Sequence, residues 1–178
     1  HVCTAPCGRT RSVAGRVVGG IGMLLGGRFP RSVGCQEGRG DKSATDSGEV
    51  GGKALGVVGY GSIGSQLSVL AEAFGMRVLY FDVVDKLPHG NATACDTLET
   101  LLSESDVVSL HVPQLPSTKN MIGAEQIRQM KPGSFLINNA RGNVVDLDAA
   151  AEALKSGHLL GAAIDVFPVE PNVAGEQF

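Results

Sequence analysis

Three glycines at fixed spacing carry the clearest chemical meaning in this chain, in the run Gly59-Tyr60-Gly61-Ser62-Ile63-Gly64. The run follows an apolar segment and opens an amphipathic one, so we expect it to join a strand to a helix. There the first glycine allows a tight turn, the second lets backbone approach a pyrophosphate, and the third lets helix and strand pack closely. The helix N-terminus supplies N–H groups and partial positive charge for phosphates. The run therefore predicts a dinucleotide site, although such glycines also occur in ordinary turns.

Asp82 makes the prediction more specific, because it ends the next apolar segment, 21 residues beyond Gly61. A carboxylate at this place can accept hydrogen bonds from both ribose hydroxyls and would repel a 2′-phosphate. No Arg follows within the next few residues, and Lys86 is the only nearby cation. We therefore expect NAD as the cofactor rather than NADP. A P-loop is excluded because Ser65, and not Lys, follows Gly64.

From residue 53 onward, short apolar segments alternate with segments of helical period. Strands are predicted at 54–58, 77–81, 106–110, 134–138 and 160–165, and helices near 62–74, 97–103, 123–130 and 146–156. This alternation is typical of a parallel sheet with helices on both faces, and right-handed crossovers make the natural solution a doubly wound Rossmann sheet. We therefore expect one α/β Rossmann domain, itself incomplete, over residues 53–178.

Residues 1–52 are expected to differ from the rest of the chain. Apolar residues between 11 and 25 have the spacing of a helix face, yet four glycines interrupt them. Those glycines cost about 4 kcal/mol together, at ~1 kcal/mol each relative to Ala, so this crossover helix needs tertiary or subunit contacts to persist. The segment 33–52 has almost no hydrophobic period and is predicted to be an irregular loop, so we expect residues 1–52 to be less ordered than the remainder.

Composition excludes several classes of partner. The chain of 178 residues is 43% hydrophobic and carries a net charge of −3, without a basic cluster, so neither nucleic acid nor an anionic membrane is an expected partner. No apolar run approaches the ~20 residues of a membrane span, and no signal peptide opens the chain, so a cytoplasmic protein is expected. The four cysteines lack metal spacing and are expected to be reduced; Cys3 and Cys7 are placed in a loop.

The carboxyl ends of the predicted strands carry further polar residues, and these ends meet at one edge of a parallel sheet. Arg141 follows the fourth strand, where its planar guanidinium suits a substrate carboxylate in a partly dry cleft. Asp165 closes the fifth strand, and Glu170 lies on the proline-stiffened loop after it. Such carboxylates can accept from a cofactor amide or orient a catalytic histidine. The alternative is that Arg141 is a surface residue in a turn and that Asp165 and Glu170 are solvated loop acids without a role in binding.

Four segments taken together resemble the D-2-hydroxyacid dehydrogenase family. They are Gly59 to Gly64, Ser109-Leu110-His111-Val112-Pro113, Asn138-x-x-Arg141-Gly142 and Ala163-Ile164-Asp165-Val166-Phe167-Pro168-Val169-Glu170-Pro171. The resemblance is dense from residue 53 to 171 and patchier upstream. It implies an oxidoreductase that acts on the CH–OH group of a 2-hydroxy acid, one that itself carries a phosphate, with NAD as cofactor and with a homo-oligomeric full-length enzyme.

The resemblance also implies a role for individual positions. Ser62 and Ile63 would contact the pyrophosphate through backbone, and Asp82 the adenosine ribose. The turn His111-Val112-Pro113 would lie on the adenosine side, whereas Asn139, Ala140 and Arg141 would line the nicotinamide side. Asp165 would accept from the carboxamide, and Arg141 would also hold the carboxylate and carbonyl oxygen of the substrate. Glu170 would pair with the catalytic histidine of the family and favour its protonated form.

That catalytic histidine lies in the family about two dozen residues after the glutamate, in an H-x-G-G segment that this chain does not contain. Of the four histidines present, His111 alone is expected at the correct sheet edge, where loop packing is its expected role. The chain is therefore expected to be a piece of a longer enzyme, without its substrate domain or a C-terminal regulatory domain, and inactive alone.

Other functions remain open from the residues. A transcriptional corepressor of the same fold family would bind NAD as a sensor, and the NAD domain of an S-adenosylhomocysteine hydrolase uses a similar glycine run. Arg141 followed by the Asp165 to Glu170 loop favours the dehydrogenase. An inert NAD-binding piece is the third alternative.

Overall fold

The structure is a computed structural model that describes residues 2–3 and 50–166. Its strands are β1 (Val2–Cys3), β2 (Ala54–Val58), β3 (Arg77–Phe81), β4 (Thr93–Ala94), β5 (Val107–Leu110), β6 (Ser134–Asn138) and β7 (Leu159–Ile164). Its helices are α3 (Ser62–Ala73), α4 (Leu98–Glu104), α5 (Ala124–Gln129) and α6 (Leu147–Lys155), with short 3-10 turns at η1 (Pro116–Thr118) and η2 (Gly142–Val144).

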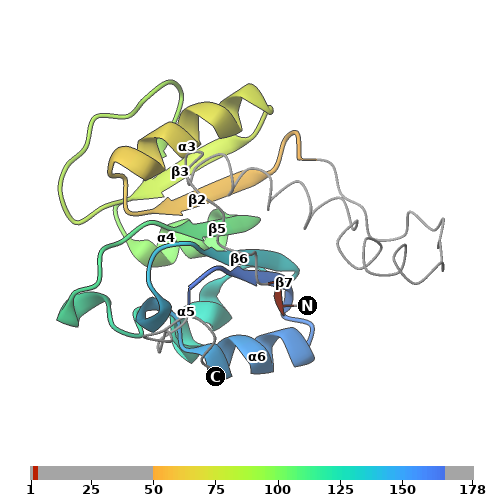
Figure 1. The fold of residues 1–178 in the computed structure, drawn as a ribbon. Helices are drawn as coiled ribbons and strands as arrows, with labels where there is room; N and C mark the ends of the chain where they lie inside the picture. Colours follow the sequence, from red (N-terminus) through yellow and green to blue (C-terminus); the bar gives the residue numbers. More distant parts are fainter. Residues whose placement is uncertain (1, 4–49, 167–178) are drawn as a thin grey trace, which may run out of the picture.

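All seven strands join one sheet in the order β1-β7-β6-β5-β2-β3-β4, and each neighbouring pair is parallel (Figure 1). The chain moves outward from β2 to β3 and β4, then crosses back to β5 on the other side of β2. The order therefore reverses between β2 and β5, which is the topological switch point where doubly wound folds bind ligands. The predicted Rossmann fold is confirmed.

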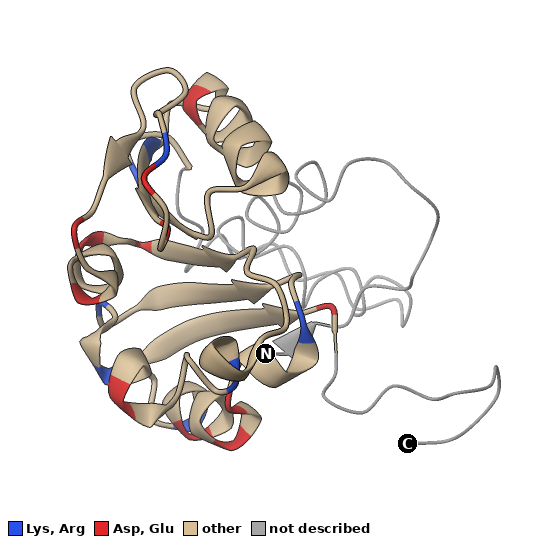
Figure 2. Cartoon of the chain, turned by 90° about the vertical axis from the view of Figure 1, so that its left-hand side faces the viewer, with Lys and Arg blue, Asp and Glu red and all other residues tan. Residues whose placement is uncertain are grey.

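Each face of the sheet has its own hydrophobic core. Leu67 and Ala71 of α3 pack on one face, whereas residues of α4, α5 and α6 such as Leu101, Ile127 and Ala150 pack on the other. Because side chains alternate along a strand, β2 contributes to both cores. The strands β2, β5, β6 and β7 carry no charged residue, and Figure 2 shows the charged residues on the surrounding helices and loops. Burial on both faces explains why these strands are continuous apolar runs.

Gly56 of β2 illustrates how closely the helices approach the sheet. A β-carbon at this position would lie 2.6 Å from Cδ2 of Leu101 and would collide with Oγ of Ser105. Ser105 itself is fully buried, and its hydroxyl donates to the carbonyl oxygen of Leu101 at 2.7 Å. The glycine therefore lets α4 lie directly on the central strand.

Most of the predicted elements are present, with ends that differ by about one residue. The expectation that Cys3 lies in a loop is wrong, because Val2 and Cys3 form an edge strand that pairs with Ala162 and Ala163 of β7. The strand β4 and the two 3-10 turns were also not predicted. The proposed helix at 11–25 and the irregular loop at 33–49 lie outside the described residues.

Candidate functional site

Strand register gathers the predicted site residues at one edge of the sheet. Val58 is paired with both Phe81 and Leu110, Leu110 with Asn138, and Asn138 with Ile164. The residues that follow these paired ends are Gly59, Asp82, His111, Asn139 and Asp165. Positions more than 100 residues apart in sequence therefore line the same carboxyl edge, across the switch point between β2 and β5.

The three glycines of the turn after β2 differ in their surroundings. Gly59 has a φ of +93°, and a β-carbon on it would lie 2.8 Å from the carbonyl oxygen of His111. A β-carbon on Gly64 would collide with the carbonyl oxygen of Gly59 and lie 2.9 Å from Cγ1 of Val57. Gly61, in contrast, has no atom within 4 Å of that position. The first and third glycines serve the fold, and the second leaves open space above the turn.

The N-terminus of α3 points into this open space without a partner from a described side chain. Its N-cap residue is Gly61, no side chain caps it, and its first turn contains no acidic residue. Ser62 and Ile63, the first residues of the helix, are exposed. A helix end of this kind offers N–H groups and partial positive charge, so it suits an anionic group such as a pyrophosphate.

Asp82 is fixed beside the turn by two backbone N–H groups. One carboxylate oxygen accepts from the N–H of Tyr60 at 2.8 Å, and the other accepts from the N–H of Val84 at 3.1 Å. Each oxygen keeps one further acceptor position, which is the number that two ribose hydroxyls require. The N–H of Tyr60 is thus directed at Asp82 and its side chain is buried, so Tyr60 supports the cofactor turn instead of facing the crevice.

Asn138 belongs to the Asn138-x-x-Arg141-Gly142 motif, but sequence reasoning assigned it no role. It is fully buried at the end of β6, where its side-chain amide donates to the carbonyl oxygen of Arg141 at 3.0 Å and accepts from the N–H of Ala140 at 3.1 Å. Its own carbonyl oxygen accepts from the N–H of Asp165 at 3.0 Å. Asn138 therefore holds the Arg141 turn and the end of β7 together. The signal for it was an amide residue three positions before an arginine at a strand end.

Arg141 itself is exposed, and its Nη1 donates to the carbonyl oxygen of Ala140 at 2.7 Å. Among the described residues this is its one side-chain hydrogen bond, so its other guanidinium donors can serve a planar, two-oxygen partner. Asn139 of the same turn and Asp165 after β7 are half-buried, and Ala140 is buried. Glu170, the remaining catalytic candidate, lies outside the described residues.

His111 lies at the same edge, next to the glycine turn, with half-buried Val112 and exposed Pro113 after it. Its Nε2 is 2.9 Å from Oγ of Ser109, and its backbone N–H donates to Val58. Burial lowers the pKa of His111 to about 4, so the imidazole is neutral at pH 7. A neutral, packed imidazole agrees with a role in loop packing, and it is unsuited to donating a proton at neutral pH.

The buried imidazole predicts a specific loss of stability in mild acid. The folded-state pKa of His111 lies near 4 and the usual value is 6.5, so the unfolded chain binds more protons between these values. Stability from this group is fully present above pH 6.5 and is lost as the pH falls toward 4, by roughly 2 to 3 kcal/mol at pH 4.5. We expect urea unfolding at pH 7 and pH 4.5 to show this loss, and His111→Gln to reduce it. An equal acid loss in both proteins would contradict the assignment.

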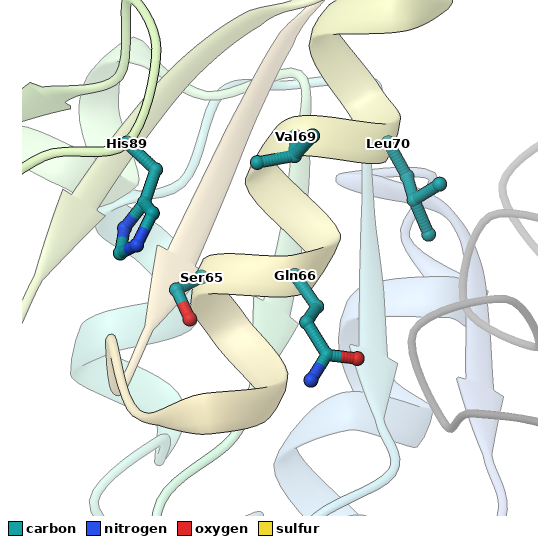
Figure 3. Close-up of a pocket in the computed structure, with 5 residues that line it drawn as sticks. All are labelled: Ser65, Gln66, Val69, Leu70 and His89. Carbon is teal, nitrogen blue, oxygen red and sulfur yellow. The ribbon is translucent and has the colours of Figure 1, made fainter.

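The structure also contains an open pocket of about 400 Å³ on the outer side of α3, lined by Ser65, Gln66, Val69, Leu70 and His89 (Figure 3). Four of its lining residues belong to α3, and His89 belongs to the loop after β3. Within residues 2–3 and 50–166, no three His, Cys, Asp or Glu side chains gather as metal ligands. No helix of that described part is long and apolar enough to cross a membrane.

Fold and site together define a dinucleotide-binding Rossmann domain. The chain belongs to the D-isomer specific 2-hydroxyacid dehydrogenases, whose NAD binding domain matches residues 28–178. Its cofactor is therefore NAD, as the glycine run and Asp82 predicted. The family assignment also separates the chain from the S-adenosylhomocysteine hydrolases.

The relatives agree with this assignment. The chain is 55% identical over 177 residues to D-3-phosphoglycerate dehydrogenase of Haemophilus influenzae and 53% identical to that of Escherichia coli K12, each match covering 99% of the chain and 43% of the relative. The chain thus spans less than half the length of these relatives. Among solved structures, D-lactate dehydrogenase with NAD+ from Lactobacillus jensenii superposes with a TM-score of 0.82 at 32% identity, over 93% of this chain and 50% of that one.

Proposed function

We propose that the chain is the NAD-holding part of a D-3-phosphoglycerate dehydrogenase, which oxidises 3-phospho-D-glycerate to 3-phosphohydroxypyruvate in serine biosynthesis. The observation that carries the proposal is the 55% identity over 99% of the chain with a relative of that name. That match covers 99% of the chain, so every strand end of the site lies within it. It therefore supports the same substrate and not only the same fold.

The residues at the sheet edge fit NAD. Gly61 leaves space above the turn, the uncapped end of α3 offers N–H groups to the pyrophosphate, and Asp82 keeps two acceptor positions for ribose hydroxyls. When bound, NAD supplies the acceptor for the hydride that leaves the carbon bearing the hydroxyl group. The chain's own contribution is to bind and orient the cofactor and the substrate.

Arg141 is the residue of this chain that we assign to the substrate. Arg141 lies on the turn after β6, which the buried Asn138 holds in place. Its guanidinium binds the carboxylate and the carbonyl oxygen of the substrate. Asn139 and Ala140 line the nicotinamide side, and Asp165 accepts a hydrogen bond from the carboxamide. Glu170 pairs with the catalytic histidine of the family and stabilises its charged form. That histidine accepts the hydroxyl proton as the substrate is oxidised.

Two further expectations remain proposals. The substrate and NAD are intracellular metabolites, which supports action in the cytoplasm. A homo-oligomer is supported by exposed large apolar side chains on α3 and at its C-terminal end, among them Val69 at 51% and the C-cap residue Phe74 at 57%.

Calorimetry of NAD binding tests the cofactor site through Asp82. We expect Asp82→Ala to weaken NAD binding by about 100-fold, because two hydrogen bonds to a charged group are lost at ~1.5 kcal/mol each. The matched control is Asp85→Asn, which removes a charge from an exposed position on the same loop and should leave the affinity unchanged. Absence of measurable NAD binding by the wild type, or equal affinity in Asp82→Ala, would contradict the proposed cofactor site.

A further inference from the structure

The loop 83–91, between Asp82 and β4, has no helix or strand of its own, and its apolar side chains are exposed, with Val83 at 91% and Leu87 at 88%. Three side chains from outside the loop form hydrogen bonds with its backbone. The hydroxyl of Tyr80 donates to the carbonyl oxygen of Lys86 at 2.7 Å, the hydroxyl oxygen of Tyr60 accepts from the N–H of His89 at 3.2 Å, and Glu72 accepts from the N–H of Asn91 at 2.8 Å. The course of this loop therefore depends on residues outside it.

Tyr60 differs from the other two because it also belongs to the cofactor turn. Its backbone N–H donates to Asp82, and its ring stacks on that of Tyr80 with centroids 3.9 Å apart. Both tyrosines are almost completely buried in the core beneath α3. One residue thus joins the glycine turn, the ribose-binding carboxylate and the loop that follows it.

The direction of the hydrogen bonds can be assigned. The hydroxyl of Ser68 donates to the carbonyl oxygen of Ser65 at 2.8 Å, and a hydroxyl group has one proton to give. The 2.7 Å contact between Tyr60 and Ser68 must then run from the tyrosine hydroxyl to the serine oxygen. This leaves the tyrosine oxygen to accept from His89, so an ordered chain leads from the loop into the first turns of α3. Figure 3 shows His89 on the loop beside Ser65. Hydrogen bonds in series strengthen one another.

We propose that the hydroxyl of Tyr60 is a positioning group for the adenosine end of NAD, because it holds the loop 83–91 against α3 in the conformation that accepts the nucleotide. The proposal rests on the proposed role of Asp82 in the cofactor site. The loop begins directly after this residue, and the N–H of Val84 binds the carboxylate. A loop released at His89 has more conformations to lose when the nucleotide binds, and ordering backbone opposes binding.

Tyr60→Phe tests the hydroxyl alone, since it keeps the stacked ring and the backbone N–H. We expect the affinity for NAD and for AMP to fall by the same factor, about 5- to 10-fold, while the affinity for nicotinamide mononucleotide stays within twofold. Hydrogen exchange at the amide of His89 should become faster in the variant. Ser105→Ala is the matched control, because it removes a buried hydroxyl bond on the opposite face of the sheet and should lower stability without changing AMP affinity.

Several outcomes would overturn the proposal. AMP affinity within twofold of wild type in Tyr60→Phe would do so, as would an equal loss of nicotinamide mononucleotide binding. Should Tyr60→Phe fail to fold, Ser68→Ala removes the acceptor of the tyrosine proton instead, and unchanged AMP affinity there counts against the proposal. Fast exchange of the His89 amide in the wild type would refute the hydrogen bond itself. Failure of the wild type to bind NAD would refute the assigned cofactor site instead, which keeps the two failures distinguishable.

Discussion

Gly61→Ala is expected to weaken NAD binding by at least about 100-fold while leaving the folded domain intact. The backbone of Gly61 is extended, with φ −83° and ψ −162°, and its β-carbon position has no neighbour within 4 Å. Alanine is therefore accommodated with a stability change within roughly 0.5 kcal/mol. The new methyl group would, however, stand where the pyrophosphate approaches the turn. Calorimetry and urea unfolding measure the two quantities separately.

Gly64→Ala is the matched comparison, because it is expected to change the stability of the domain. Here a methyl group would collide with the carbonyl oxygen of Gly59 and crowd Val57, so α3 must move away from β2. We expect a loss of stability of about 1 to 3 kcal/mol. If Gly61→Ala destabilised the domain as much as Gly64→Ala, or bound NAD normally, the division of roles among the glycines would be wrong.

Substitution of Arg141 is expected to give the largest loss of activity. Arg141→Gln should lower kcat/KM for 3-phospho-D-glycerate by about 1000-fold and leave the affinity for NAD within twofold, because it removes a charged two-point contact with the substrate. Since the chain spans 43% of its relatives' length, the assay belongs in the longest natural form of the protein.

Two further variants complete the Arg141 experiment. Arg141→Lys keeps the charge but loses the planar fork, so an intermediate loss is expected. Arg128→Gln is the matched control, because Arg128 is exposed on α5, away from the strand ends. Unchanged kcat/KM in Arg141→Gln would remove this residue from the substrate site.

Local patterns in the sequence were sufficient for the central fold. The strands β2, β3, β5, β6 and β7 are apolar because both of their faces are buried, and this makes them visible in a single sequence. The two-residue strands were not predictable in the same way. Both residues of β4 are exposed and carry no apolar signal, and β1 pairs with residues about 160 positions later, which no local pattern records.

The site was predicted at the level of residue types but not of hydrogen bonds. Spacing alone placed Asp82 beside the glycine turn, because the length of α3 and the strand register determine that distance. Spacing did not reveal that Tyr60 turns its ring into the core and gives its N–H to Asp82, since both facts depend on packing under α3. The role of Asn138 was not predicted for the same reason, because its side chain bonds two neighbouring backbone groups.

The uncapped start of α3 has a thermodynamic consequence. Most helices satisfy their first N–H groups with a side chain, and a missing cap costs about 1 kcal/mol. Asp146 does so for α6 and Thr97 for α4, whereas no side chain does so at Gly61. We therefore expect the pyrophosphate of bound NAD to cap α3, so that NAD binding also completes the helix. Because NAD binds the folded state, the melting temperature of the domain must rise with NAD concentration. The melting temperature therefore reports how much of the protein has cofactor bound.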